Sequence, residues 1–167
     1  MNRILSFFSI AIFSIFLGSQ ITEGCLLVPY WKMLSRTEFY EYYSKFGPSI
    51  GKFYTALTII ATLIPISISI YCFSNKLRAL KYSVLSSLFA FLIIVLFYAY
   101  FKDANQQFYE ITFNANQLKS ELKTWEYWHW LRVLLEFLSL IFLILALNVL
   151  SKKESSKDHN QTIKNII

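Results

Sequence analysis

The sequence predicts an all-α integral membrane protein, a bundle of four transmembrane helices, and three observations support this fold class. Of the 167 residues, 56% are hydrophobic and only 16% are charged, whereas about a quarter of the residues of a soluble domain are charged. A small domain leaves much of its surface in water, so it cannot hide this much apolar surface. The apolar residues also gather into four long runs. These observations exclude a soluble enzyme and a disordered chain.

The four runs cover residues 4–30, 53–73, 82–101 and 128–150. A helix needs about 20 residues to cross about 30 Å of hydrocarbon. The backbone finds no water to bond inside a membrane, so each run is predicted to be a helix despite its β-branched residues. We therefore predict a single transmembrane domain over residues 1–150 and a polar cytoplasmic tail over residues 151–167.

The first run is the least regular of the four, because Gln20 and Glu23 interrupt its apolar residues. Its beginning also has the pattern of a secretory signal peptide, with a basic N-terminus, an apolar stretch and small residues after it. Leu17 is a poor match to the small residue expected before a cleavage site. On this ground we favour one uncleaved span over cleavage.

A short amphipathic helix is predicted in the first outer connection. Ser35 and Glu38 have the spacing of a capping box, in which each side chain bonds the backbone of the other residue. Aromatic residues follow, and Gly47-Pro48 is expected to end the helix. So many aromatic side chains fit either a helix lying in the headgroup layer or a lid folded over the bundle.

A further helix is predicted ahead of the last span, with Asn116 as its N-cap and residues 117–124 as its body. Trp125, Trp128 and their aromatic neighbours then form a belt at the outer interface, where indole rings favour the headgroup level. Trp31 stands at the matching end of the first span.

The two middle spans each carry a stripe of small or hydroxyl-bearing residues. The stripes consist of Thr55, Thr58, Thr62, Pro65, Ser69 and Cys72 on the second span and of Ser83, Ser86, Ser87 and Ala90 on the third. Small residues let membrane helices approach closely. Both stripes are therefore interpreted as packing surfaces rather than as the wall of a channel.

The basic residues indicate the orientation of the helices. Lys76, Arg78 and Lys81 crowd a short connection that has no acidic residue, whereas the outer connections spread their cations widely. Positive residues gather on the cytoplasmic side, so both termini are predicted to be cytoplasmic, in a plasma or inner membrane. The net charge of +6 is then explained by the topology and by contact with anionic lipid headgroups, and does not indicate binding to nucleic acid.

Five polar residues lie inside the first and last spans, where ionisable groups are costly and need a partner or a purpose. His129, Arg132 and Glu136 are spaced i, i+3 and i+7, which places them on one helix face. Gln20 and Glu23 share a face of the first span. Each Glu lies eight residues inside a flanking tryptophan, or about 12 Å deep. If the two helices are neighbours, the five side chains form one pocket.

Three interpretations of this cluster stay open. Two carboxyls around one guanidinium leave the charge unbalanced, so one Glu is expected to hold a proton or bind a cation, as in a ligand- or proton-handling site. Alternatively, Arg132 pairs with Glu136 and extends toward the interface, which makes the cluster structural. A metal site is the weakest interpretation, because one His and two Glu lack a close-spaced ligand motif. No metal and no cofactor is expected.

Several short motifs along the chain are those of one known family. They are Gly18, Pro29-Tyr30-Trp31, Glu38-Phe39, Gly51, the pair Asn114 and Asn116, and Trp125-x-x-Trp128-His129-x-x-Arg132. With them the sequence resembles the anthrone oxygenase-like family of small four-helix membrane proteins, most of whose bacterial members have no assigned function. The resemblance implies a four-helix bundle and, from the fungal relatives, oxidation of an anthrone to an anthraquinone without a cofactor.

Two hypotheses of function follow. In the first, an outer-leaflet pocket binds or oxidises a lipophilic aromatic molecule, with Glu23 or His129 as the base and Arg132 steadying a phenolate or enolate. The candidate catalytic residues are Glu23, His129, Arg132 and Glu136, and the candidate ligand-binding residues are Gln20, Trp31, Asn114, Trp125 and Trp128. In the second, the protein is a non-catalytic membrane subunit or scaffold, and the cluster only fixes helix packing.

A proton or ion conductor is a third hypothesis and ranks last. Conduction requires polar residues through both leaflets, and the inner half of the spans offers only hydroxyls and Cys72. Membrane lipid and a lipophilic small molecule are the expected partners, and assembly into a homo-oligomer stays open.

Overall fold

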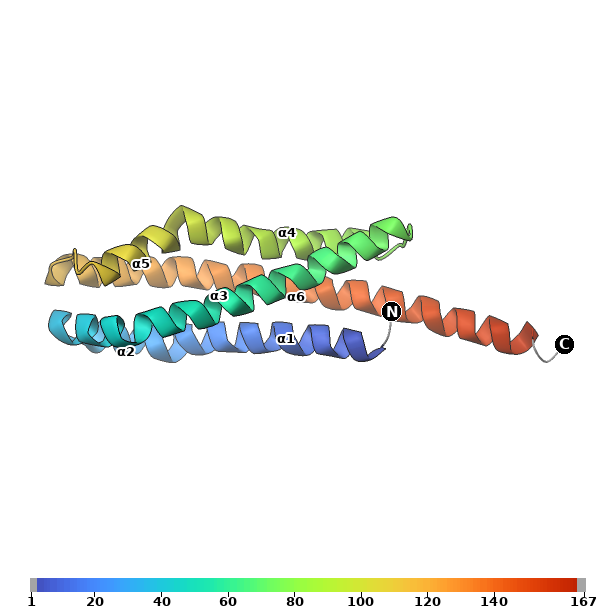
Figure 1. Ribbon diagram of the computed structural model, residues 1–167, viewed down its shortest axis with the longest axis horizontal. Helices are drawn as coiled ribbons and strands as arrows, with labels where there is room; N and C mark the ends of the chain where they lie inside the picture. Colours follow the sequence, from blue (N-terminus) through green and yellow to red (C-terminus); the bar gives the residue numbers. More distant parts are fainter. Residues whose placement is uncertain (1–2, 165–167) are drawn as a thin grey trace.

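A computed structural model shows long helical segments packed side by side (Figure 1). The structure describes residues 3–164 and the side chains of residues 4–152. Four segments are long and apolar enough to cross a membrane, namely Ile4–Met33, Arg36–Ser74, Leu80–Tyr109 and Ala115–Lys152. No strand occurs in the part of the chain that the structure describes. The predicted all-helical architecture with four candidate spans is confirmed.

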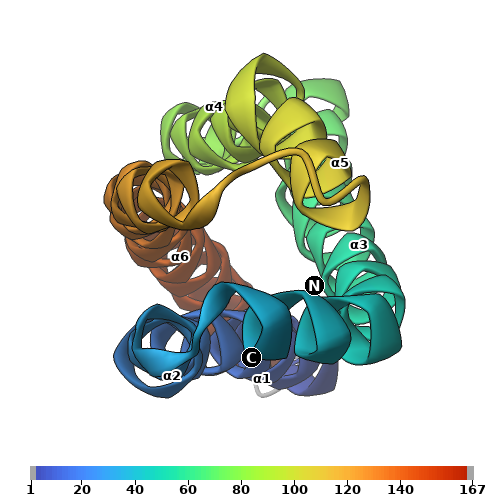
Figure 2. The ribbon, with the colours of Figure 1, turned by 90° about the vertical axis from the view of Figure 1, so that its left-hand side faces the viewer.

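The elements follow one another with short connections. They are α1 (Arg3–Thr22), the π-helix η1 (Glu23–Leu27), α2 (Val28–Met33), α3 (Arg36–Ser74), α4 (Leu80–Leu96), the π-helix η2 (Phe97–Phe101), α5 (Lys102–Tyr109) and α6 (Ala115–Lys164). The first and third spans are thus each an α-helix that continues through a π turn into a second α-helix. Viewed from one end, α1 with α2, then α6, then α4 with α5, then α3 surround the bundle axis (Figure 2). The first and last spans are therefore neighbours.

The core divides into two apolar clusters along the bundle. One cluster is built from aliphatic and aromatic residues of α1, α3 and α6 toward the chain termini, and includes Phe13, Phe16 and Leu143. The other is rich in aromatic residues and includes Trp31 and Trp125. The polar residues of the first span fall between these two clusters along the chain.

The helix that begins after Ser35 is longer than predicted. The capping box is present, because Ser35 Oγ accepts from the Glu38 N–H and Glu38 Oε2 accepts from the Ser35 N–H at 2.8 Å. The prediction that Gly47-Pro48 ends a separate short amphipathic helix is wrong, because α3 runs without a break to Ser74. The fixed φ angle of proline is compatible with a helix. Because proline has no N–H, Pro48 removes one backbone hydrogen bond, a loss that membrane helices tolerate.

The start of α6 also differs from the prediction. Asn114, not Asn116, is the cap: its side-chain oxygen accepts from the N–H groups of Asn116 and Gln117, both at 3.0 Å. The Gln117 side chain in turn accepts from the Asn114 N–H. Helix α6 also continues past the last span to Lys164, through most of the predicted tail. The side chains of the tail beyond Lys152 lie outside the described residues.

Paired serines join α4 to α6, which confirms that the stripe on the third span is a packing surface. The Ser86 hydroxyl donates to the Ser139 carbonyl at 2.8 Å, and the Ser139 hydroxyl donates to the Ser86 carbonyl at 2.8 Å. Both side chains are fully buried. Ser69 and Ser87 likewise form a 2.9 Å bond between α3 and α4.

We expect Ser86→Ala to lower the free energy of unfolding by about 0.6–1 kcal/mol, the usual size of one hydrogen bond between membrane helices. The measurement is an unfolding titration in mixed micelles. Ser9→Ala is the matched control, because the Ser9 hydroxyl bonds only the Leu5 carbonyl of its own helix and its loss should change stability by less than about 0.5 kcal/mol. Equal losses for the two variants would show that the serine pair does not stabilise the contact.

Candidate functional site

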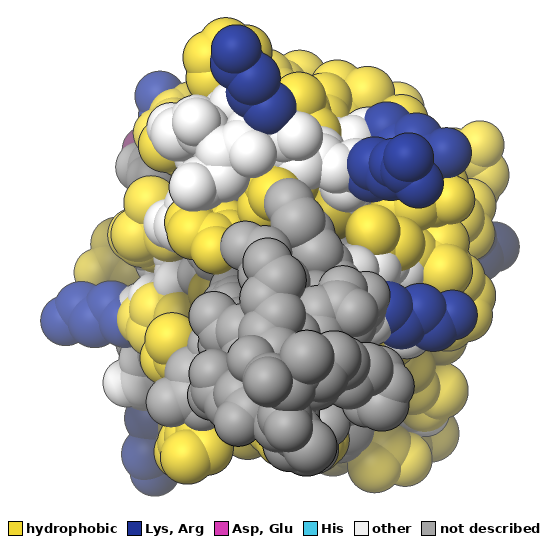
Figure 3. Space-filling view, turned by 90° about the vertical axis from the view of Figure 1, so that its right-hand side faces the viewer, with side chains coloured by type: hydrophobic (Ala, Val, Ile, Leu, Met, Phe, Trp, Pro, Cys, Tyr) yellow, Lys and Arg dark blue, Asp and Glu magenta, His cyan; other side chains and the backbone are white. Residues whose placement is uncertain are grey.

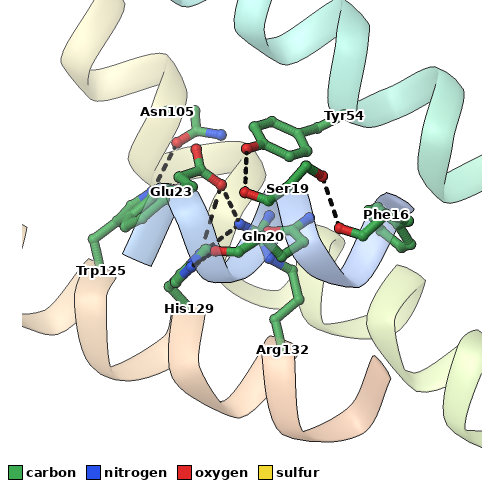
Figure 4. Close-up of polar contacts among 9 residues, drawn as sticks. All are labelled: Phe16, Ser19, Gln20, Glu23, Tyr54, Asn105, Trp125, His129 and Arg132. Atoms are coloured by element: carbon green, nitrogen blue, oxygen red, sulfur yellow. Dashed lines mark hydrogen bonds and ion pairs between the residues drawn. The ribbon is translucent and has the colours of Figure 1, made fainter. Parts of the chain in front are cut away.

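The polar residues of the first and last spans meet at the contact between α1, η1 and α6, and Figure 4 shows four of them, Gln20, Glu23, His129 and Arg132. Gln20, Glu23, His129, Arg132 and Glu136 are all buried. Arg132 Nη2 donates to Glu23 Oε2 at 3.0 Å and to His129 Nδ1 at 2.6 Å. The predicted proximity of Glu23, His129 and Arg132 is therefore confirmed.

His129 has both ring nitrogens occupied. Because a guanidinium can only donate, Nδ1 is the acceptor of the bond from Arg132, and the ring proton must lie on Nε2. Nε2 then donates to the Gln20 carbonyl at 2.9 Å. The ring also stacks on Trp125, with centroids 5.1 Å apart and planes 11° from parallel. His129 thus orients Arg132 and leaves no nitrogen free to act as a base.

Arg132 pairs with Glu23 rather than with Glu136. The ion pair joins residues 109 positions apart, so it links the first span to the last. Three aromatic rings surround the guanidinium, those of Phe101 at 4.6 Å, Trp125 at 5.7 Å and Tyr54 at 5.9 Å from its central carbon. Aromatic faces attract a cation more strongly where water is excluded. The alternative in which Arg132 pairs with Glu136 is wrong within the described contacts.

Glu136 and the Gln20 side chain are the unpaired members of the cluster. Both residues are fully buried, and among the described residues no hydrogen-bond partner reaches either carboxyl oxygen of Glu136 or either amide atom of Gln20. Buried polar groups are paired in the great majority of cases. Of the two carboxyl groups that the sequence placed around one guanidinium, Glu23 is therefore the one that forms the ion pair, and Glu136 has no partner among the described residues.

A cavity of about 310 Å³ opens beside the ion pair and has walls from all four spans. Its polar lining includes Glu23, Arg132, Tyr54 and Asn105, and its aromatic lining includes Trp31 and Trp125. Asn105 is held in place because its side-chain oxygen accepts from the indole N–H of Trp125 at 3.0 Å. The Tyr54 hydroxyl donates to the Ser19 carbonyl at 3.0 Å and ties α3 to α1.

Both π-helices border this cavity. Glu23 is the first residue of η1, and η2 contributes Phe97 and Tyr98 to the lining. A π turn inserts one extra residue and so rotates the following helix, and such turns are frequent at functional sites. Sequence reasoning did not find these turns, nor the parts played by Tyr54 and Asn105.

The stripe on the second span has two roles along its length. The half nearer the end of α3 at Ser74 packs, as predicted, with Thr62 and Cys72 buried. The half nearer its start does not, because Thr55 and Thr58 line the cavity. The interpretation of the whole stripe as a packing surface is thus wrong for these two residues.

The structure divides the predicted site residues into three groups. Those that line the cavity are Glu23, Trp31, Trp125 and Arg132. Those outside the lining but adjoining the ion pair on α1 and α6 are Gln20, His129 and Glu136. Those that lie apart are Trp128, whose ring stacks on Tyr100 at 5.6 Å, and Asn114, whose side chain caps α6.

Within the described residues, no three His, Cys, Asp or Glu side chains are placed to hold a metal ion. No protein-family model, curated protein or solved structure matches this chain. The resemblance to the anthrone oxygenase-like family therefore stays a prediction.

Proposed function

We propose that this protein binds a lipophilic small molecule in the cavity between its four helices. One observation supports the proposal above the others: a buried Glu23–Arg132 ion pair is open to a cavity whose walls are mainly apolar and aromatic. Small-molecule sites combine an apolar lining of about 300 Å³ or more with a few placed polar groups. An ionisable residue inside a span also marks a functional site by default.

The cavity rim favours entry from the lipid. Gly51, Thr55 and Ile59 of α3 and Phe97 and Tyr98 of η2 all line the cavity and are exposed on the outside of the bundle. In a protein that crosses the membrane, side chains on this surface face hydrocarbon. A ligand dissolved in the bilayer could therefore reach the ion pair between α3 and η2 without passing through water.

The distribution of cations supports an outer-leaflet site. Figure 3 looks onto the end of the molecule that carries the connection between α3 and α4, and Lys and Arg side chains surround this end. That connection holds Lys76 and Arg78, with Lys81 just inside α4. Since positive residues gather on the cytoplasmic side, we place this end in the cytoplasm. The cavity then lies in the outer half of the membrane.

An oxygenase-like reaction is a narrower proposal for the same site. Oxidation of an anthrone by dioxygen to an anthraquinone and water starts with removal of a proton from the methylene carbon that lies across the central ring from the ketone. Because both nitrogens of His129 are occupied, Glu23 is the carboxylate that lines the cavity and can accept this proton. Arg132, also in the lining, would stabilise the enolate oxygen.

The alternative is a non-catalytic subunit or scaffold whose polar cluster holds the helices together. The bond between His129 and the Gln20 carbonyl favours it, because that bond joins the first and last spans without lining the cavity. A scaffold needs the ion pair but does not need an open cavity. Filling the cavity while leaving the ion pair intact therefore separates the two functions.

We expect Gly51→Leu to weaken binding of an apolar ring probe, 2-isopropenylnaphthalene, by at least about tenfold, because the new side chain occupies the cavity mouth. Gly51 lines the cavity, and a Cβ added there meets no atom within 4 Å. Gly18→Leu is the matched control, since Gly18 is an exposed helical glycine with equally open space but lies outside the cavity lining.

Binding is measured by equilibrium dialysis of protein-bearing lipid nanodiscs against empty nanodiscs of the same lipid. Both variants should fold with unchanged helix content, which is checked by circular dichroism. Binding that survives Gly51→Leu as well as Gly18→Leu would contradict a ligand in this cavity and favour the scaffold.

A further inference from the structure

The side-chain amide of Asn105 carries a hydrogen-bond donor that no described residue uses. Asn105 is partly buried and lines the cavity, and its oxygen accepts from the indole N–H of Trp125 at 3.0 Å. An indole nitrogen can only donate, so the amide oxygen must face Trp125 and the NH₂ group must point the other way. The amide nitrogen has no partner among the described residues, but it keeps accessible surface, unlike the enclosed indole nitrogen of Trp31.

The amide nitrogen of Asn105 is directed into the cavity. Figure 4 shows it pointing toward Tyr54, which belongs to the same lining. The proton of the Tyr54 hydroxyl is already taken by the Ser19 carbonyl at 3.0 Å, and the Arg132 guanidinium is paired with Glu23 at 3.0 Å. Asn105 therefore offers an uncharged and unused donor to a molecule that occupies the cavity.

Contacts on both sides of Asn105 fix the direction of this donor. The Trp125 ring, which holds the amide oxygen, stacks on His129 with ring centroids 5.1 Å apart. Helix α5, which carries Asn105, is anchored by an edge-to-face contact of Phe108 with Phe39, at 5.3 Å between ring centroids. The amide is therefore a preorganised donor, whose bond with a ligand requires little further ordering.

We infer that Asn105 is a specificity-determining residue of this site, and that it selects lipophilic molecules bearing a hydrogen-bond acceptor oxygen, such as a ketone. The inference rests on the proposed function and deepens it. The amide N–H donates to that oxygen, while the aromatic walls of the cavity contact the apolar body of the ligand. A hydrocarbon of the same shape binds less well, because it shuts water out of the cavity and leaves the N–H unpaired.

The test uses two probes of nearly identical shape. In 2-acetylnaphthalene a carbonyl oxygen stands where 2-isopropenylnaphthalene has a methylene group. Equilibrium dialysis of nanodiscs, with empty nanodiscs subtracted, gives the affinity of each probe for the wild type and for Asn105→Leu, in which a side chain of similar size has no donor. We expect Asn105→Leu to lose about fivefold in affinity for the acetyl probe, the effect of one net hydrogen bond, and less than about twofold for the isopropenyl probe.

Removing Asn105 also frees the Trp125 N–H to take its place. The double variant Asn105→Leu, Trp125→Phe lacks both donors, and we expect it to lose the preference for the acetyl probe. Thr55→Val is the matched control, because Thr55 lines the cavity but its hydroxyl already donates to the Gly51 carbonyl at 2.7 Å. We expect it to change the affinities of the two probes by the same factor. A preference that the double variant keeps in full, or that Thr55→Val loses as fully, would overturn the inference.

The two proposals fail in different ways. If neither naphthalene probe binds the wild type above empty nanodiscs, the proposed function is wrong. If both bind the wild type equally, the cavity binds ligands but Asn105 does not select for an acceptor. This second comparison needs no variant, so it stands even if Asn105→Leu does not fold.

Discussion

Arg132→Met is expected to lower the free energy of unfolding by about 3 kcal/mol or more, the cost of removing one partner of a buried ion pair. Arg132 is 9% exposed, and its Nη2 atom satisfies both Glu23 and His129. Methionine keeps much of the length of the side chain, so the change removes the charge and the donors more than the volume. The measurement is reversible unfolding in mixed micelles.

A second ion pair in the same protein provides the control. Lys32 and Glu126 lie 2.6 Å apart, but their side chains are 33% and 27% exposed. Exposed pairs contribute little, so Lys32→Met should cost less than about 1 kcal/mol. The double variant Glu23→Met, Arg132→Met is expected to recover part of the loss, because no buried charge is then left without a partner. Equal losses for Arg132→Met and Lys32→Met would rule out a stabilising role for the buried pair.

The fold could be predicted from the sequence because a bilayer imposes a simple length and composition on each span. The errors lie where a helix extends beyond its apolar run. The third span was expected to end at residue 101, but helix continues to Tyr109. The sequence did not predict this extension because Lys102–Tyr109 is mainly polar and lacks the apolar run by which a span is found. Similarly, a proline such as Pro48 usually marks the end of a helix in a soluble protein, but a helix in a membrane bundle can continue through it.

The site could be predicted only in part. Helical spacing placed Glu23 with Gln20, and Arg132 with His129, on shared faces, and both predictions hold. That α1 packs beside α6 depends on the tertiary structure, and so does the choice of Glu23 over Glu136 as the partner of Arg132. A π turn begins at Glu23, and no residue pattern in the sequence announces such a turn. Tyr54 reaches the site from α3, and no pattern in the sequence marks it as a site residue.

Gly24→Ala is expected to lower the free energy of unfolding by about 1–3 kcal/mol, the usual cost of overfilling a packed contact. An added Cβ would lie 2.9 Å from His129 Nε2 and 2.9 Å from an indole carbon of Trp130. Real Cβ atoms do not approach other groups so closely, so the His129 and Trp130 side chains must shift away from η1. That movement stretches the 2.9 Å bond between His129 and the Gln20 carbonyl. His129 is then less well placed to orient Arg132, the partner of Glu23.

The matched control for Gly24→Ala is Gly18→Ala, which is expected to change the free energy of unfolding in the opposite direction. Gly18 lies on the same span, is exposed, and has nothing within 4 Å of an added Cβ. Gly18→Ala should therefore stabilise by up to about 1 kcal/mol, since alanine loses less backbone entropy in a helix. Thermal unfolding in detergent, followed by circular dichroism, measures both. If the two alanines stabilise alike, α6 can yield at His129 and Trp130, and the contact between the first and last spans is not the rigid support that the ion pair requires.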